Sequence, residues 1–167
     1  MHGGAIQWKS TAFAWVPVRS NGSGSVNISE YVILGYPFAP CFGNGRILLQ
    51  ARGDNAVIDI GPRSAISNNV SIIAMSRVSI GADCMIGDMV SIFDCDFHNI
   101  DPNSRNSNGK VAEVVIGKNV WLGSSVIVLK GVEIGDNSVV AAGSLVNKSL
   151  PSNVVAAGVP AKAIKQI

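Results

Sequence analysis

The sequence predicts an all-β fold, a parallel β-helix in which short strands alternate with tight corners. Three observations support this prediction. Aliphatic residues recur at every sixth position over two long stretches of the 167-residue chain. Eighteen glycines supply places where the chain can bend sharply. The hydrophobic fraction is 47% and aromatic residues make up only 6%, so a core must be built from Val, Ile, Leu and Ala side chains.

The six-residue period is clearest in the C-terminal half. From residue 116 the chain reads "IGKNVW", "LGSSVI", "VLKGVE", "IGDNSV" and "VAAGSL", and an aliphatic residue opens each block. A small or aliphatic residue falls four places after each opener, and glycine often follows the opener directly. The openers, with the residue that continues the series, are Ile116, Leu122, Val128, Ile134, Val140 and Val146.

The same period appears earlier in the chain. The openers there are Ile60, Ile66 and Ile72 and, after a slip of two residues, Ile80, Ile86 and Ile92, with weaker traces from Val26 and Val32. A six-residue unit is too short for a pair of helices and fits one short strand plus a corner. Three units would close a triangular coil of about 18 residues, and stacked coils would form the β-helix. A β-sandwich with alternating strands is the alternative, but it does not require a strict period of six.

Composition limits the organisation and the partners. The length fits one domain, which we place at residues 26–167, after an N-terminal segment (residues 1–25) with no clear pattern. Charged residues make up only 14%, which suggests that part of the surface is buried in an oligomer. A net charge of +2 argues against nucleic acid as a partner. No apolar run approaches the roughly 20 residues of a membrane span.

The three cysteines, Cys41, Cys84 and Cys95, form no CxxC pair. Their odd number favours reduced thiols and a cytoplasmic protein. No metal site is predicted, because the chain has only two histidines, His2 is remote from His98, and no ligand pair has zinc spacing.

The loop at residues 98–115, "HNIDPNSRNSNGKVAEVV", interrupts the period and begins on His98. Its Pro, Gly, Asn and Ser residues are typical of a loop that protrudes from a corner. Histidine is suited to general-base catalysis near neutral pH, and a carboxylate can fix its tautomer. Asp94 and Asp96 precede the ring and Asp101 follows it; strand alternation favours the first two. A solvated loop histidine that bonds to a neighbouring Asp is the alternative.

Two stretches and the C-terminus resemble a known family. "DCDFHNIDP" followed by "VVIGKNVWLGSSVIVLKGVEIG", and the ending "VVAAGVPAKAIK", are similar to hexapeptide-repeat acyltransferases, especially sugar O-acetyltransferases of the galactoside and maltose type. The resemblance covers about residues 57–165. It implies a left-handed β-helix, acetyl-CoA as the acyl donor, and a sugar or polysaccharide precursor as the acceptor. It also implies a homotrimer with active sites between subunits, in which His98 is the general base.

The resemblance also assigns binding residues. Asn69 of "SNNVSI" would bind the acceptor, although asparagine is also common at a left-handed corner. The backbone N–H of Ser124 would face the thioester carbonyl, while Lys162 and Lys165 would neutralise phosphates where the family often has arginine. At Asn147 the family usually has threonine. The residues implied for the coenzyme are Trp121, Ser124, Ala142, Asn147, Lys148, Lys162 and Lys165.

Two other functions remain open from the sequence. One is N-acetylation of an amino sugar by the same site. The other is a β-helix that only serves assembly, although a purely structural prism would not need His98, the loop and the basic tail together.

Overall fold

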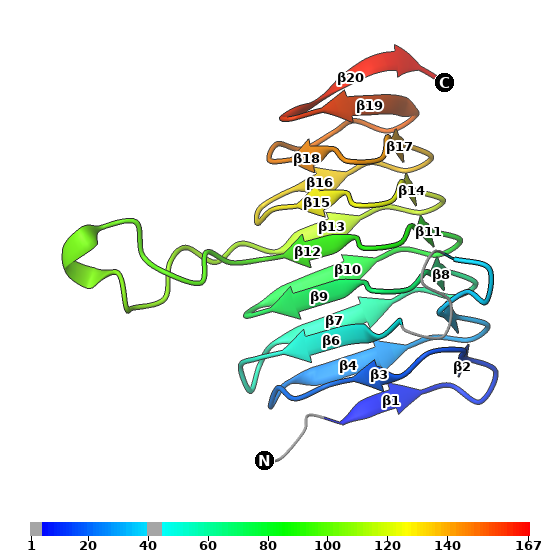
Figure 1. Cartoon of the computed structure of the whole chain (residues 1–167), viewed down its shortest axis with the longest axis horizontal. Coiled ribbons are helices and arrows are strands. Elements are labelled where there is room, and N and C mark those ends of the chain that lie inside the picture. Colours follow the sequence, from blue (N-terminus) through cyan, green and yellow to red (C-terminus); the bar gives the residue numbers. More distant parts are fainter. Residues whose placement is uncertain (1–4, 40–44) are drawn as a thin grey trace.

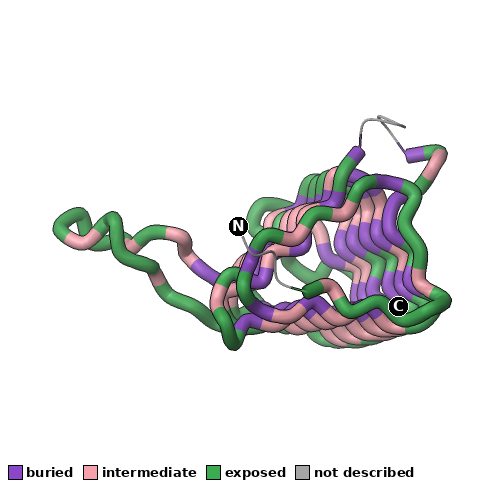
Figure 2. Tube along the Cα trace, turned by 90° about the horizontal axis from the view of Figure 1, so that it is seen from below, coloured by how far each residue is buried: buried purple, intermediate pink, exposed green. Residues whose placement is uncertain are grey.

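The chain forms a prism with three flat faces, from which one long loop protrudes (Figure 1). The computed structural model describes residues 5–39 and 45–167. Each turn of the chain passes through three sheets, here called A, B and C. Within each sheet the neighbouring strands come from successive coils and pair in parallel, with one antiparallel exception at the C-terminal end. Seen along the prism axis, the coils lie over one another (Figure 2).

The strands are short, as expected for a six-residue unit. Sheet A contains β1 (Ile6–Trp8), β4 (Ser25–Ile28), β7 (Val57–Ile60), β10 (Arg77–Ile80), β13 (Val114–Ile116) and β16 (Glu133–Ile134). Sheet B contains β2 (Phe13–Ala14), β5 (Ile33–Leu34), β8 (Ala65–Ile66), β11 (Met85–Ile86), β14 (Trp121–Leu122), β17 (Val139–Val140), β19 (Val154–Gly158) and β20 (Ala161–Gln166). Sheet C contains β3 (Val18–Arg19), β6 (Ile47–Ala51), β9 (Ser71–Ala74), β12 (Ser91–Phe93), β15 (Ile127–Val128) and β18 (Leu145–Val146).

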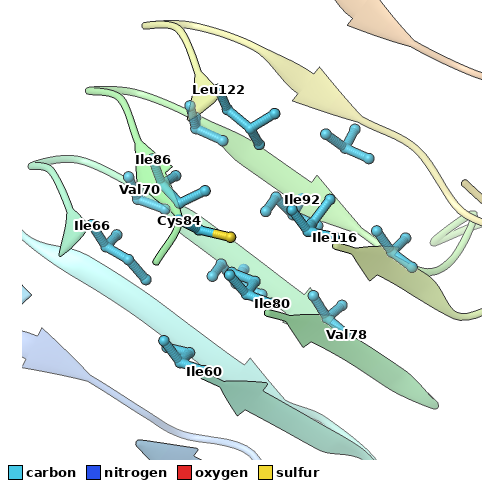
Figure 3. Close-up of a cluster of buried hydrophobic side chains, with 14 of the residues drawn as sticks. Ile60, Ile66, Val70, Val78, Ile80, Cys84, Ile86, Ile92, Ile116 and Leu122 are labelled. Atoms are coloured by element: carbon cyan, nitrogen blue, oxygen red, sulfur yellow. The ribbon is translucent and has the colours of Figure 1, made fainter. Parts of the chain in front are cut away.

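Columns of aliphatic side chains fill the prism (Figure 3). Ile60, Ile80 and Ile116 pair residue to residue along sheet A, and each is at most 3% exposed. Every opener predicted between residues 60 and 146 is buried, so the predicted core is confirmed. Full burial of each such side chain stabilises the fold by roughly 1.5–3 kcal/mol.

The structure corrects the repeat at two places. In the second coil Ile28, two residues after the expected Val26, pairs with Ile60 and occupies the opener column. Ser76, four places after the opener Ile72, is exposed, whereas Ser64 and Val70 at the same place of the repeat are buried. It lies in a corner lengthened by the slip of two residues.

The N-terminal segment also takes part in the prism. Strand β1 pairs with β4, and β2 and β3 pair with β5 and β6. The prism therefore begins at least as early as Ile6, before the boundary at residues 25 and 26 expected from the sequence.

The protruding loop leaves the prism between sheets C and A (Figure 1). It runs from Asp94, directly after β12, to Glu113, directly before β13, and it contains a short 3₁₀ helix, η1 (Pro102–Ser104). We call residues 94–113 the arm. The sequence placed this loop at 98–115, but Val114 and Val115 belong to sheet A. At the other end of the chain, β19 and β20 form an antiparallel hairpin that continues sheet B as a short tail. Within residues 5–39 and 45–167, no helix is long and apolar enough to cross a membrane.

Candidate active site

The arm is a two-stranded structure at its root. Asp96 N donates to Lys110 O (2.8 Å), and Gly109 N donates back to Asp96 O (2.9 Å). The two strands approach so closely that a Cβ on Gly109 would lie 2.5 Å from the His98 carbonyl oxygen, so this position requires glycine. These contacts hold the backbone on both sides of His98 in place.

Aromatic packing ties the root of the arm to the prism. The Phe97 ring lies edge-to-face with Phe93 of β12, at 5.4 Å between centroids. The Arg52 guanidinium lies 4.7 Å from the Phe97 centroid on the same ring. Residue 97 is therefore anchored to sheet C, and His98 is the first exposed side chain after this anchor.

The His98 ring is oriented by a backbone carbonyl. Its Nδ1 atom lies 3.1 Å from Arg105 O, across the arm. A carbonyl oxygen can only accept, so Nδ1 must carry the proton and donate. The other ring nitrogen, Nε2, then has a free lone pair in the neutral imidazole. An exposed imidazole with this tautomer can accept a proton from a hydroxyl.

The two carboxylates expected to orient His98 have other roles. Asp94 is fully buried and accepts three backbone hydrogen bonds, from Met75, Ser76 and Arg77, at 2.7–2.8 Å. It therefore caps the lengthened corner of the coil below. The expectation from strand alternation fails here because β12 ends at Phe93, and beyond that residue the side chains no longer alternate.

Asp96 forms an ion pair with Lys130, with 2.7 Å between Oδ1 and Nζ. The pair borders a cavity of about 550 Å³ between the arm and the prism, lined also by Asn99, Ile100 and Lys110. Asp101, the third acid near the ring, accepts from Asn103 N and caps η1. None of the three carboxylates hydrogen-bonds to the His98 ring.

Ser124 lies at the corner between sheets B and C. It is one coil above the corner that precedes β12, the strand from which the arm departs. Its N–H has no acceptor among the described residues. The equivalent N–H three coils below, that of Tyr36, does have an acceptor: Tyr36 N donates to Asn68 Oδ1 of the next coil (2.9 Å). Ala142 takes the place of that asparagine above Ser124, by the pairing of β14 with β17. Alanine has no side-chain acceptor, so the described coil above does not cap the Ser124 N–H, and this donor stays available on an exposed residue.

Trp121 is half exposed on the outer face of β14. It lines an apolar cavity of about 420 Å³ together with Tyr36, Met85 and Gly87. Gly87 connects this cavity to the Ser124 corner, because a Cβ on Gly87 would lie 2.6 Å from Ser124 N. The cavity therefore ends beside the Ser124 backbone.

Asn69 has the conformation of a corner residue. Its φ is +60°, as at the equivalent Met89 (+57°) and Ser125 (+60°), and its side chain donates to Asp88 Oδ1 (3.2 Å). Its buried neighbour, Asn68, holds the backbone of Tyr36. These contacts give both asparagines a structural role; a role of Asn69 in acceptor binding stays a prediction.

Of the residues expected to bind the coenzyme, Trp121 is on sheet B, and Ser124 and Ala142 are at its corner with sheet C, whereas Asn147 and Lys148 follow β18 at the corner between sheets C and A. Ala142, Asn147 and Lys148 are all exposed on the coil directly above that of Ser124. Lys162 and Lys165 are exposed on β20, paired with Ala157 and Val155 of β19. Two cations on the outer edge can attract phosphates by charge, without the bidentate contacts that arginine makes.

His98 and Ser124 are on different corners of one prism. The arm leaves from the corner between sheets C and A, whereas Ser124 is at the corner between sheets B and C, with sheet C between them. The arm extends away from the prism and from its own Ser124. A single chain therefore presents the two groups on separate surfaces.

The cysteines and acids form no metal centre in the described part of the chain, where no group of three or more His, Cys, Asp or Glu side chains could hold an ion. Burial, and the nearby Asp94 charge, raise the pKa of the Cys95 thiol to about 11. Burial likewise raises the pKa of Cys84. Both thiols are buried and protonated near neutral pH, so neither is a nucleophile or a ligand. Cys41 lies outside the described residues.

Known proteins share this architecture. Residues 113–148 match the family model "Bacterial transferase hexapeptide (six repeats)". A putative lipopolysaccharide biosynthesis O-acetyl transferase, WbbJ of Escherichia coli (strain K12), is 35% identical over 162 residues, which are 90% of this chain and 76% of that protein. The chain belongs to the hexapeptide-repeat acetyltransferase family. The prism is accordingly the left-handed parallel β-helix of this family.

Three further comparisons show the extent of the likeness to known acetyltransferases. The galactoside O-acetyltransferase of Escherichia coli (strain K12) is 41% identical over 112 residues, covering 66% of this chain and 54% of that protein. The chain thus spans about half the length of this relative. A structure of a polySia-specific acetyltransferase, NeuO, superposes with a TM-score of 0.74 at 30% identity, covering 93% of this chain and 68% of that one. A galactoside acetyltransferase in complex with coenzyme A gives 0.63 at 40% identity, covering 66% and 55%.

Some groups of the site could not be found from the sequence. The hydrogen-bond partner of the His98 ring is the backbone carbonyl of Arg105, which no residue type in the sequence reveals. Lys130 is a second such group. It lies one residue before the glycine of "VLKGVE", and only the fold brings it to Asp96, 34 positions away in the sequence.

Proposed function

We propose that this protein is an acetyl-CoA-dependent O-acetyltransferase that acetylates a hydroxyl of a sugar or of a polysaccharide precursor. The observation that carries the proposal is the His98 ring, whose Nδ1–H is held by Arg105 O while Nε2 remains free on an exposed arm. A galactoside O-acetyltransferase and a lipopolysaccharide O-acetyl transferase among the relatives support the reaction class.

The reaction needs two groups of this chain. His98 Nε2 accepts the proton of the acceptor hydroxyl while that oxygen attacks the thioester carbonyl. The N–H of Ser124 donates to the carbonyl oxygen as negative charge develops there, a contribution of about 2.7–4 kcal/mol for one such donor. When the carbon–sulfur bond breaks, His98 returns the proton to the leaving thiolate.

The coenzyme would run along the C-terminal half of sheet B. Trp121 would pack against its acyl end, and the corner of Ala142 would contact the pantetheine arm. Asn147 and Lys148, at the corner between sheets C and A, would contact the coenzyme of a neighbouring subunit. Lys162 and Lys165 would face the phosphates. The structures of a relative with coenzyme A and of another with acetyl-CoA support this donor class.

The proposed site is completed by a second copy of the chain. His98 and Ser124 lie on different corners of one prism, so the arm of one subunit must reach the Ser124 corner of the next. Such a contact joins two different surfaces, and it closes into a ring when the rotation between subunits allows. A homotrimer satisfies this requirement with three identical sites, and it gives the low charge content of the surface a physical reason.

The first test is a product assay. Purified protein, acetyl-CoA and a panel of sugars, nucleotide sugars and glycans are incubated, and acetylated products are identified by mass spectrometry. Paired acceptors that carry a hydroxyl or an amine at the same carbon separate O-transfer from the second candidate, N-acetylation of an amino sugar.

The variant that tests the chemistry is His98→Ala. It should lower turnover by about 10²–10⁴-fold, because the general base is lost. Arg105→Ala is the matched control, since it keeps the carbonyl that orients the ring and should retain most of the activity. A near-normal rate for His98→Ala, with the fold intact by circular dichroism, would contradict the proposed mechanism.

A further inference from the structure

Sheet B carries exposed apolar side chains that the proposed chemistry does not use. They come from the first four coils and lie on one face and its corner. Phe13, Ile33 and Met85 form one outer column, because β2, β5, β8 and β11 pair in register. We call this surface the aromatic strip, and it consists of Phe13, Trp15, Ile33, Tyr36, Phe38 and Met85.

The aromatic rings of the strip are ordered by one another but remain open to solvent. Phe13 and Trp15 pack edge-to-face at 5.3 Å, and Tyr36 and Phe38 do so at 5.7 Å. Even so, Trp15 is 58% and Phe38 is 84% exposed. Clustered aromatic side chains left exposed at this level mark a binding surface more often than a packing accident.

The strip continues into the proposed catalytic groove. The cavity of about 420 Å³ is lined by Ile33, Tyr36 and Met85 of the strip and also by Trp121. From β2 to β14 there are four strand spacings, or about 19 Å along the prism axis. The strip thus leads from the Ser124 corner towards the N-terminal end, in the direction opposite to the lysines of β20.

The chemistry of the strip selects its occupant. None of the ten residues that line the cavity is charged. A pyranose ring presents an apolar face of C–H groups, which can stack on an aromatic ring while the hydroxyl groups at its edge stay in water. An uncharged sugar therefore matches the strip, whereas an anionic chain or an anionic membrane surface would require lysine or arginine.

We infer that the aromatic strip binds several consecutive uncharged sugar rings, so that the acceptor is an oligosaccharide or polysaccharide chain. The inference rests on the proposed function for the direction of the groove. The ring to be acetylated lies near Ser124, and its neighbours in the chain stack on Tyr36, Phe38, Trp15 and Phe13.

The experiment measures binding without the acyl donor. Neutral oligosaccharides of one to six residues, in glucose, galactose and N-acetylglucosamine series, are titrated into the full-length protein by calorimetry. Affinity should rise by about tenfold or more between one and four rings in at least one series, as added rings find aromatic partners. The double variant Trp15→Ala/Phe38→Ala should lose this gain and bind the longer chains about as weakly as the single sugar.

Tyr31→Ala is the matched control. Tyr31 is 62% exposed in the same coil as Ile33, but it lies at the corner between sheets A and B, outside the strip. The control should keep the full dependence on chain length. Equal affinity for all lengths in every series, or an unchanged length dependence in the double variant, would overturn the inference. A change in oligomeric state of the double variant by light scattering would also overturn it, and would assign the strip to contact between copies.

Failure of the proposed function would appear in different measurements from failure of the strip. Coenzyme A binding and acetyl transfer are measured in parallel on the same preparations. Length-dependent glycan binding without any acetyl transfer would contradict the enzyme and support the strip. Acetyl transfer that is equally efficient for single sugars and long chains would support the enzyme and contradict the role of the strip.

Discussion

In the prism wall each coil is hydrogen-bonded to the coils on both sides, whereas the arm at residues 94–113 bonds mainly to itself. The inner columns of the wall are almost completely buried, and the arm beyond Phe97 is largely exposed. A wall residue is thus fixed by many equivalent neighbours. His98 is fixed by one carbonyl and by a few contacts at the root of the arm.

The difference explains how one molecule combines a rigid frame with a group that must reach another subunit. The wall can present a backbone N–H, such as that of Ser124, at a defined place because the repeat determines the backbone there. The arm can extend because its polar side chains need no core. The boundary between the two regions falls at Asp94 and Asp96, two carboxylates that lie only two residues apart.

Asp94 gives the largest expected effect on the wall. Replacement by alanine removes three backbone hydrogen bonds to a buried carboxylate, and a bond to a charged group contributes about 1.5–3 kcal/mol, so Asp94→Ala should lower the free energy of unfolding by about 3 kcal/mol. Urea denaturation followed by circular dichroism measures this. Asp96→Ala is the control and should cost less than about 1 kcal/mol, because its ion pair is partly exposed. An equal loss of unfolding free energy in the two variants would contradict the proposed boundary between wall and arm.

Ala142 tests what the wall contributes to the chemistry. In Ala142→Asn the new amide oxygen should cap the Ser124 N–H as Asn68 caps Tyr36, and turnover should fall by about 10²-fold through loss of the donor. Ser124→Ala is the matched control, since it removes only the exposed hydroxyl and keeps the N–H. Steady-state rates with acetyl-CoA and the best acceptor give the comparison. A full rate in Ala142→Asn would mean that the Ser124 N–H does not stabilise the oxyanion.

The same variant separates a shared site from a site within one chain. His98→Ala and Ala142→Asn subunits, each nearly inactive alone, are co-expressed. If the site uses His98 of one subunit and Ser124 of the next, randomly mixed rings should regain about one quarter of the wild-type sites. Activity equal to the sum of the two inactive parents would place both groups in a single chain.

The sequence predicted the wall well and the arm poorly, for a physical reason. Burial forces an aliphatic residue at each opener, so Ile80 or Leu122 can be placed by counting. No such constraint acts on the arm, where His98 is oriented by a main-chain oxygen and Asp94 turns inward once β12 has ended. That His98 lies on the protruding loop followed from the period, but the start of the arm at Asp94 and the partner of the His98 ring required coordinates.

Lys130 gives the smallest expected effect and tests how firmly the arm must be held. It belongs to the wall, and its ion pair with Asp96 crosses to the arm. Lys130→Ala removes one contact at the root while Phe97 and the backbone bonds remain, so turnover should fall by a factor of about 2–10 and stability by less than about 1 kcal/mol. The exchange of charges in Lys130→Asp/Asp96→Lys should recover part of the rate, because the pair can form again with the opposite polarity. If the single variant lost as much activity as His98→Ala, the arm would depend on this ion pair alone, and the root contacts of Phe97 and Gly109 would not be what positions the histidine.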